Sequence, residues 1–262
     1  MRQRRRVGSL ELDFEAPEAG RYAAPIIVCP GLFQSLECWR PLTSMLAHRG
    51  WELYFLGRGP EDGGQLGWQD NIDRIAEAGT ALGGQVIVLG ADLGAALALA
   101  AAVPASPTSS INAMALALFA PSRPSQLAAS LKTSRPMLER SGGPWQGAPR
   151  SISSQSLQPS HQAREAALLL EEAALSDFEI PVTHPPALVF TAEGDALVPP
   201  EESGRFAAGP YSEQARGRLA GRWWAAAGQA AVADELHRYL ILTLGDRVVE
   251  FPEEILAQDS ED

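Results

Sequence analysis

Five short hydrophobic runs stand out along the chain, and each has Gly or Pro at one of its ends or within two residues of it. Within each run the apolar residues are continuous and do not alternate with polar ones, which is typical of strands covered on both faces. We therefore predict five buried strands, at residues 25–29, 52–56, 85–89, 113–119 and 187–190.

Helical patterns lie between and after these runs. Three of the four predicted helices end at Gly and the other stops before Pro104, as helices commonly do. They span residues 39–49, 71–82, 93–102 and 230–244. Because strands and helices alternate, the connections should be right-handed crossovers, and we expect an α/β fold with a mainly parallel sheet and helices on both faces.

Residues 121–186 interrupt this alternation. The segment is rich in Ser, Pro and Gly and carries one helical pattern, at residues 162–174. It is too long for a simple connection between two strands, so we expect a small lid over the strand ends. The whole chain, residues 1–262, is then expected to be a single domain with this insertion.

The strongest chemical signal is Gly90-Ala91-Asp92-Leu93-Gly94, which follows one predicted strand and opens a predicted helix. Small residues on both sides of Asp92 allow a turn sharp enough to project its side chain above the sheet. The spacing is that of the nucleophile elbow G-x-S-x-G, with Asp in the place of Ser. A dinucleotide-binding turn is excluded because the middle Gly of G-x-G-x-x-G is missing, and a P-loop is excluded because Gly-Lys-Ser and Gly-Lys-Thr never occur.

Three further motifs follow the same order and spacing as motifs of the α/β-hydrolase superfamily. They are Pro30-Gly31-Leu32, Gly57-Arg58-Gly59 and the segment from Gly194 to Pro199. Together with the elbow, they give the chain a resemblance to that superfamily over nearly its whole length. The resemblance implies an α/β-hydrolase-like fold.

The resemblance also implies roles for individual residues. Asp92 matches the catalytic nucleophile, and Asp195 matches the acid of the catalytic triad. The backbone N–H groups of Leu32 and Leu93 match the donors that bind an oxyanion or a halide. Members of the superfamily with Asp at the elbow resemble haloalkane dehalogenases and epoxide hydrolases.

The histidine of the triad has no recognisable counterpart. The resemblance places it in the loop before the last helix, and Arg222 stands there. His237 falls inside the predicted last helix, and His161 and His184 lie in or beside the lid segment. The triad is therefore expected to be degenerate.

The loss of this base has a specific chemical consequence. A carboxylate with an ordinary pKa near ~4 is ionised at neutral pH, so Asp92 needs no base to attack an electrophilic carbon. Water must then cleave the resulting ester, which is the step that His assists as general base. Arg stays protonated and cannot replace it. We therefore expect a slow or inactive relative of hydrolases that act on ester, epoxide or carbon–halide bonds.

Two other hypotheses stay open. The chain could be a non-catalytic protein that binds a small ligand, in which Asp92 caps a helix for roughly 0.5–2 kcal/mol and Arg222 pairs with Asp92 or Asp195. It could also be an active hydrolase with an atypical base, Glu193 or a histidine of the lid.

Composition limits the partners. The net charge of −11 argues against nucleic acid, which needs a basic face. The arginines at the amino terminus are expected to form a solvated basic tail at residues 1–6, and residues 251–262 an acidic one. The expected partner is a small apolar ligand or substrate.

Composition also bears on location and cofactors. The apolar stretch 86–103 contains Asp92, and a charge at a bilayer centre is costly, so we expect no membrane span. Cys29 and Cys38 are too few for a disulfide framework or a zinc site. We therefore expect buried thiols, a cytoplasmic location, and neither a metal nor a cofactor.

Overall fold

The structure is a computed structural model of the whole chain. It describes residues 3–17, 22–31, 34, 36–57, 66–103, 111–130, 169, 171–176, 178–191, 198–207, 212–215 and 226–245. The expected acidic tail at 251–262 lies outside the described residues, as do most residues of the expected lid and of its helical pattern at 162–174.

The described strands form one sheet of eight strands in the order β1-β2-β4-β3-β5-β6-β7-β8. All pairs from β4 to β8 are parallel, whereas β2 pairs antiparallel with both β1 and β4 and so runs opposite to the other described strands. The predicted mainly parallel sheet is therefore confirmed. The strands are β1 (Gln3–Val7), β2 (Leu10–Glu15), β3 (Ile26–Cys29), β4 (Leu53–Phe55), β5 (Gln85–Ala91), β6 (Asn112–Phe119), β7 (Ala187–Phe190) and β8 (Glu213–Ala215).

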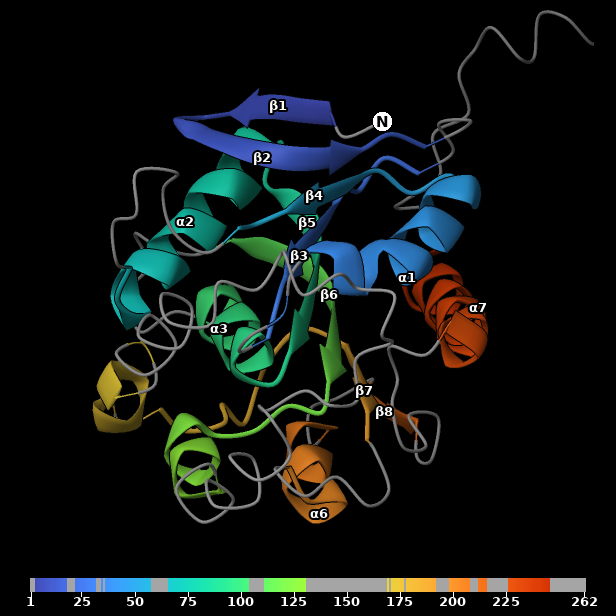
Figure 1. The fold of residues 1–262 in the computed structure, drawn as a ribbon. Helices are drawn as coiled ribbons and strands as arrows, with labels where there is room; N and C mark the ends of the chain where they lie inside the picture. The colour runs from blue at the N-terminus through green and yellow to red at the C-terminus, as the bar shows by residue number, and fades with distance from the viewer. Residues whose placement is uncertain are drawn as a thin grey trace, which may run out of the picture.

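Helices cover both faces of the sheet (Figure 1). On one face, α2 (Trp68–Ala81) and α3 (Leu93–Ala102) pack into one hydrophobic core, and on the other, α1 (Leu36–His48) and α7 (Ala226–Leu244) pack into a second. The sheet residues alternate between these two cores, which explains why the strand sequences are continuously apolar. The predicted α/β class with helices on both faces is confirmed.

The central strand β5 and the helix α3 that follows it are almost entirely buried. Neighbours on both sides of β5 run parallel to it, so the carboxyl ends of these strands meet at one edge of the sheet. Functional groups of open α/β sheets lie at this edge. The turn from β5 to α3 contains Asp92 and is located there.

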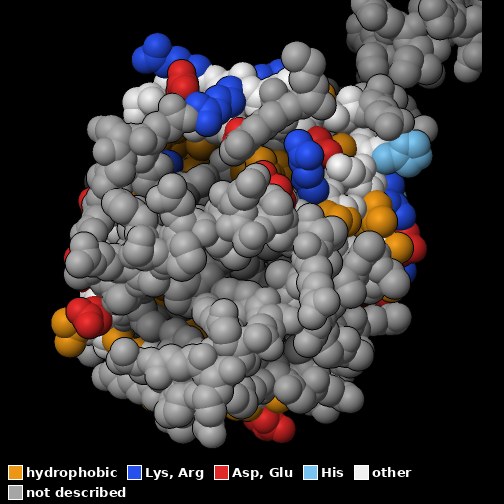
Figure 2. All heavy atoms as spheres, viewed as in Figure 1, with side chains coloured by type: hydrophobic (Ala, Val, Ile, Leu, Met, Phe, Trp, Pro, Cys, Tyr) orange, Lys and Arg blue, Asp and Glu red, His pale blue; other side chains and the backbone are white. Residues whose placement is uncertain are grey.

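The expected basic tail is wrong, because Gln3–Val7 form strand β1. A turn at Gly8 pairs it with β2, whose Leu12 and Phe14 are buried. The Arg5 guanidinium lies 3.9 Å from the centre of the Phe14 ring and donates to Glu52 at 2.6 Å. Figure 2 shows basic and acidic side chains together over this part of the molecule. Charge pairing thus holds the arginines on an edge strand, where charged side chains also discourage pairing with other chains.

Three further short elements were not predicted from the sequence. They are β8, the helix α6 (Pro200–Gly204) and the 3₁₀ turn η2 (Arg205–Ala207). Each has five residues or fewer, which is too short for a hydrophobic period. Within the described part of the chain, no helix is long and apolar enough to span a membrane.

Helix α6 is tied to the end of β6 by a partly buried ion pair. Arg123 donates to both carboxylate oxygens of Glu202, from Nε at 2.6 Å and from Nη2 at 3.0 Å. Burial raises the pKa of Glu202, but the hydrogen bonds and charge of Arg123 outweigh burial and bring this pKa below its ordinary value. The folded state therefore favours the ionised form.

We predict that this pair makes stability depend on pH. A lowered carboxyl pKa stabilises the fold above the pKa of the unfolded chain, and this contribution disappears as pH falls through the folded value. Glu202→Gln should therefore lower the free energy of unfolding by about 1–3 kcal/mol at pH 7, with a difference from wild type that shrinks below about pH 4.5. Urea unfolding of both proteins from pH 3 to pH 7 measures it. A difference that stays constant over this range would contradict the assignment.

Candidate active site

Asp92 occupies a strained turn between β5 and α3. Its backbone has φ 40° and ψ −112°, and Asp92 and Ala120 are the described residues other than Gly with positive φ. Such a conformation costs of order 1–3 kcal/mol and persists only where the surroundings enforce it. Nucleophile elbows also sit on a sharp, strained strand-to-helix turn.

Backbone hydrogen bonds fix the turn. The N–H of Asp92 donates to the carbonyl of Phe119 at the end of β6, at 2.9 Å. Ala120, the next residue, donates in turn to Phe190 at the end of β7, at 2.8 Å. Three adjacent strand ends therefore hold the elbow at the carboxyl edge of the sheet.

The side chain of Asp92 contacts one of the predicted donors directly. Its Oδ1 accepts a hydrogen bond from the backbone N–H of Leu93, the first residue of α3. A side chain that simply caps a helix has extended backbone angles and accepts from the second or third helical N–H. Asp92 differs from such a cap in both respects.

Two glycines allow the backbone to approach this turn closely. A β-carbon on Gly94 would overlap the carbonyl oxygens of Cys29 and Pro30. A β-carbon on Gly31 would overlap the Asp92 carboxyl group itself. The start of α3 therefore packs directly against the end of β3 at Gly94. The Asp92 carboxylate packs against the backbone of Gly31.

The loop that contains Gly31 is held by Gln34, a residue that the sequence analysis missed. Gln34 Oε1 accepts from the Gly31 N–H at 2.8 Å and from the indole N–H of the fully buried Trp39 at 3.0 Å. The N–H of Gln34 closes the turn by donating to the Gly31 carbonyl at 3.2 Å. Gln34 Nε2 is buried, with no hydrogen-bond partner in the described part of the chain. The sequence offered one signal for this role: Gln34 is a polar amide residue placed between Pro30-Gly31 and Trp39.

The thiol of Cys29 lies at the end of β3 and is a poor nucleophile. Burial raises its pKa to about 12, against a smaller opposing effect of the Arg74 charge. A thiol with this pKa is protonated at neutral pH, and the thiol form is a poor nucleophile.

Three of the four histidines lie near the opposite edge of the sheet. His184 lies three residues before the first residue of β7, and so near the end at which that strand begins. His237 Nδ1 accepts from the indole N–H of Trp51 at 3.1 Å, and Trp51 precedes β4. His48 ends α1, which leads into β4 from the same edge. Asp92 follows the far end of β5, so none of the three is placed to act as its base.

Several predicted site residues lie outside the described residues. They are Leu32, His161, Glu193, Asp195 and Arg222. The structure therefore brings together Asp92, the Leu93 N–H and Gly31. The roles expected of the other residues stay predictions.

Comparison with known proteins identifies the family and the fold of the chain. The sequence pattern of the alpha/beta hydrolase family matches residues 26–260, from the start of β3 to the end region of the chain. No curated protein sequence matches.

Solved structures with the same fold include two esterases and an epoxide hydrolase. An esterase from Thermogutta terrifontis is 18% identical over 92% of this chain and 99% of its own, with a TM-score of 0.59. An esterase from Exiguobacterium antarcticum is 15% identical over 92% and 99%, with a TM-score of 0.63. A structure from a study of metagenomic epoxide hydrolases from hot environments is 16% identical over 94% and 99%, with a TM-score of 0.60. At these identities the likeness concerns the fold.

Proposed function

Because the chain belongs to the alpha/beta hydrolase family, we propose that it is a relative of the family's hydrolases that retains a nucleophile and lacks the base. The observation that carries the proposal is the strained backbone of Asp92, with Oδ1 on the Leu93 N–H. A carboxylate in this position reacts with an electrophilic carbon of an epoxide or an alkyl halide.

The first step requires only the carboxylate. Asp92 Oδ2 attacks the carbon, a C–O bond forms, and the bond to the halide or to the epoxide oxygen breaks. The departing group keeps the electron pair, and an epoxide oxygen then takes a proton from water. Attack through Oδ2 leaves Oδ1 as the carbonyl oxygen of the new ester, still hydrogen-bonded to the Leu93 N–H.

The second step requires more than the described site offers. Water must attack Cγ of the ester, and negative charge then develops on Oδ1, where the Leu93 N–H would stabilise it. Deprotonation of that water typically contributes 10²–10⁴-fold and needs a base. The positions of His48, His184 and His237 near the other edge of the sheet support the loss of this base. We therefore propose that alkylation proceeds and that hydrolysis is slow or absent.

The geometry of Asp92 favours this function over a purely structural role. A helix cap gains nothing from positive φ, whereas a nucleophile at an elbow needs it to project from the sheet. A site that had lost its reaction could relax this strain by replacing Asp92 with Gly. The retained strain therefore supports a retained reaction.

A turnover assay tests the proposal at the predicted base position. Wild-type protein with excess ester, epoxide or haloalkane should release no more than about one equivalent of product. If Arg222 occupies the position of the base, Arg222→His should raise hydrolysis of a pre-formed adduct by at least about tenfold. Multiple turnovers by wild type, abolished in Asp92→Ala, would instead establish an active hydrolase with an atypical base. No gain in Arg222→His would refute the assignment of that position.

The proposal includes the ligand class and the location. A small apolar ligand or substrate is supported by the fold, and the net charge of −11 speaks against nucleic acid. A cytoplasmic location is supported by Cys29, which is a free and buried thiol.

A further inference from the structure

A pocket lies between the segment after β6, the described residues 171–175, the segment before β7, and η2. Its volume is about 810 Å³, within the range of small-molecule sites. Asp92 is not among its described lining residues. Those residues are Arg123, Pro124, Ser125, Ala173, Ala174, Phe178, Glu179, Ile180 and Arg205.

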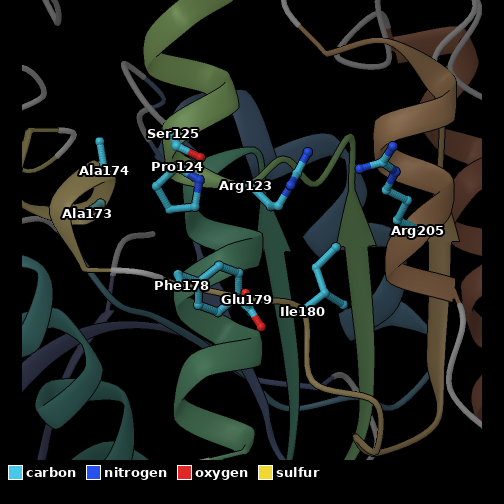
Figure 3. Close-up of a pocket in the computed structure, with 9 residues that line it drawn as sticks. All are labelled: Arg123, Pro124, Ser125, Ala173, Ala174, Phe178, Glu179, Ile180 and Arg205. Atoms are coloured by element: carbon cyan, nitrogen blue, oxygen red, sulfur yellow. The ribbon is translucent and has the colours of Figure 1, made fainter.

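Two guanidinium groups lie at one end of this pocket and share a single carboxylate. Glu202 accepts two hydrogen bonds from Arg123, and its Oε2 lies 3.5 Å from Arg205 Nη1. In Figure 3 the two guanidinium groups point toward each other. The two guanidinium groups carry two positive charges, and the nearly buried Glu202 that pairs with both carries one negative charge; Arg205 is 61% exposed. This end of the pocket therefore carries about one positive charge.

Glu179, the acidic residue among the described lining residues, does not cancel that charge. Glu179 is exposed to solvent, and Figure 3 shows its carboxylate directed away from Arg123 and Arg205. Among the other described lining residues, the partly buried Phe178 and Ile180 carry the largest apolar side chains. A net positive charge near these two side chains matches a monoanion with a short hydrocarbon tail.

We propose that this pocket binds an amphipathic organic carboxylate, separately from the Asp92 site. The carboxylate accepts from Arg205 and from the Nη1 edge of Arg123, which the Glu202 pair leaves unused in the described structure. Arginine binds carboxylates by this planar geometry. The hydrocarbon tail packs against Phe178 and Ile180. A doubly charged phosphate monoester fits less well, because only one guanidinium charge is uncompensated.

Titration of the intact protein with octanoate tests the proposal, with octan-1-ol and octylamine as controls. Octanoate should bind, more weakly at higher salt, and the two controls should bind at least about tenfold more weakly. Arg205→Gln should weaken octanoate binding roughly tenfold, while the partly buried Arg123–Glu202 pair and the melting temperature of the protein stay unchanged. Arg238→Gln, which removes an arginine paired with Glu235 outside the pocket, should change nothing.

Two further variants decide between sites. Ala174→Trp should block octanoate by filling the pocket, and Asp92→Asn should leave octanoate binding unchanged. No octanoate binding, equal binding of octan-1-ol, or equal binding in Arg205→Gln would overturn the proposal. Loss of binding in Asp92→Asn would place octanoate at the elbow and also overturn it, whatever the outcome for the proposed reaction of Asp92.

Discussion

Intact protein exposed to a reactive epoxide or alkyl bromide is expected to gain the mass of one adduct and to retain it. The Asp92 carboxylate is held at the elbow against the Leu93 N–H and needs no base to alkylate. Asp92→Asn should form no adduct at this residue, because an amide nitrogen or oxygen is a far weaker nucleophile than a carboxylate. The expected effect is thus the presence or absence of the product, measured by intact-protein mass spectrometry.

The buried thiol beside the elbow provides an internal control for this labelling. Cys29, with its pKa raised to about 12 by burial, should stay unmodified in the folded protein. Peptide mapping separates label on Asp92 from label on either cysteine. Wild-type protein that is folded but unlabelled at Asp92 would count against a retained nucleophile and favour the ligand-binding hypothesis.

Gly31→Ala is expected to lower the free energy of unfolding by about 1–3 kcal/mol and to suppress labelling of Asp92. The added methyl group would overlap the Asp92 carboxyl group, so the carboxylate must leave the Leu93 N–H or the loop must move. Gly57→Ala is a matched control, since a β-carbon there meets no atom within 4 Å, and it should stay within about 0.5 kcal/mol of wild type. Urea unfolding measures both variants.

A double-mutant cycle identifies the cause of this cost. When Asp92 is replaced by Gly, the carboxyl group that the methyl overlaps is gone, and Gly31→Ala should become nearly neutral. A Gly31→Ala variant as stable as Gly57→Ala would contradict the contact. So would an equal cost in the presence and absence of the Asp92 side chain.

The sequence predicted the parts of the fold that are buried on both faces. The apolar run of β5 and the residues of α3 could be predicted, because nearly every residue there is buried in a core. Strand β1 was not predicted, because its arginines suggest a solvent-exposed segment without regular structure. The structure shows their ion-pair partners, which are Glu11, Asp13 and Glu52. In β2, alternation of Leu10, Leu12 and Phe14 was a usable signal for a strand with one buried face.

The candidate site was predictable where it is local in sequence. The elbow occupies five consecutive residues, so its turn could be inferred from glycine spacing alone. The hydrogen bonds that Gln34 accepts could not be predicted, since they depend on the direction of its side-chain amide toward Gly31 and Trp39. The position of His184 was available in principle: a residue just before a parallel strand lies at the edge opposite to a residue just after one. That reasoning leaves His161 as the histidine whose place the described residues do not fix.

The central claim is that Asp92 reacts and that no imidazole completes turnover. The most direct test labels wild type and His161→Ala, removes the reagent, and follows the Asp92 peptide by mass spectrometry over hours at pH 7. We predict that the label persists equally in both proteins. Release of the alcohol by wild type, with retention of the label in His161→Ala, would contradict the claim, because a histidine would then be the base for Asp92.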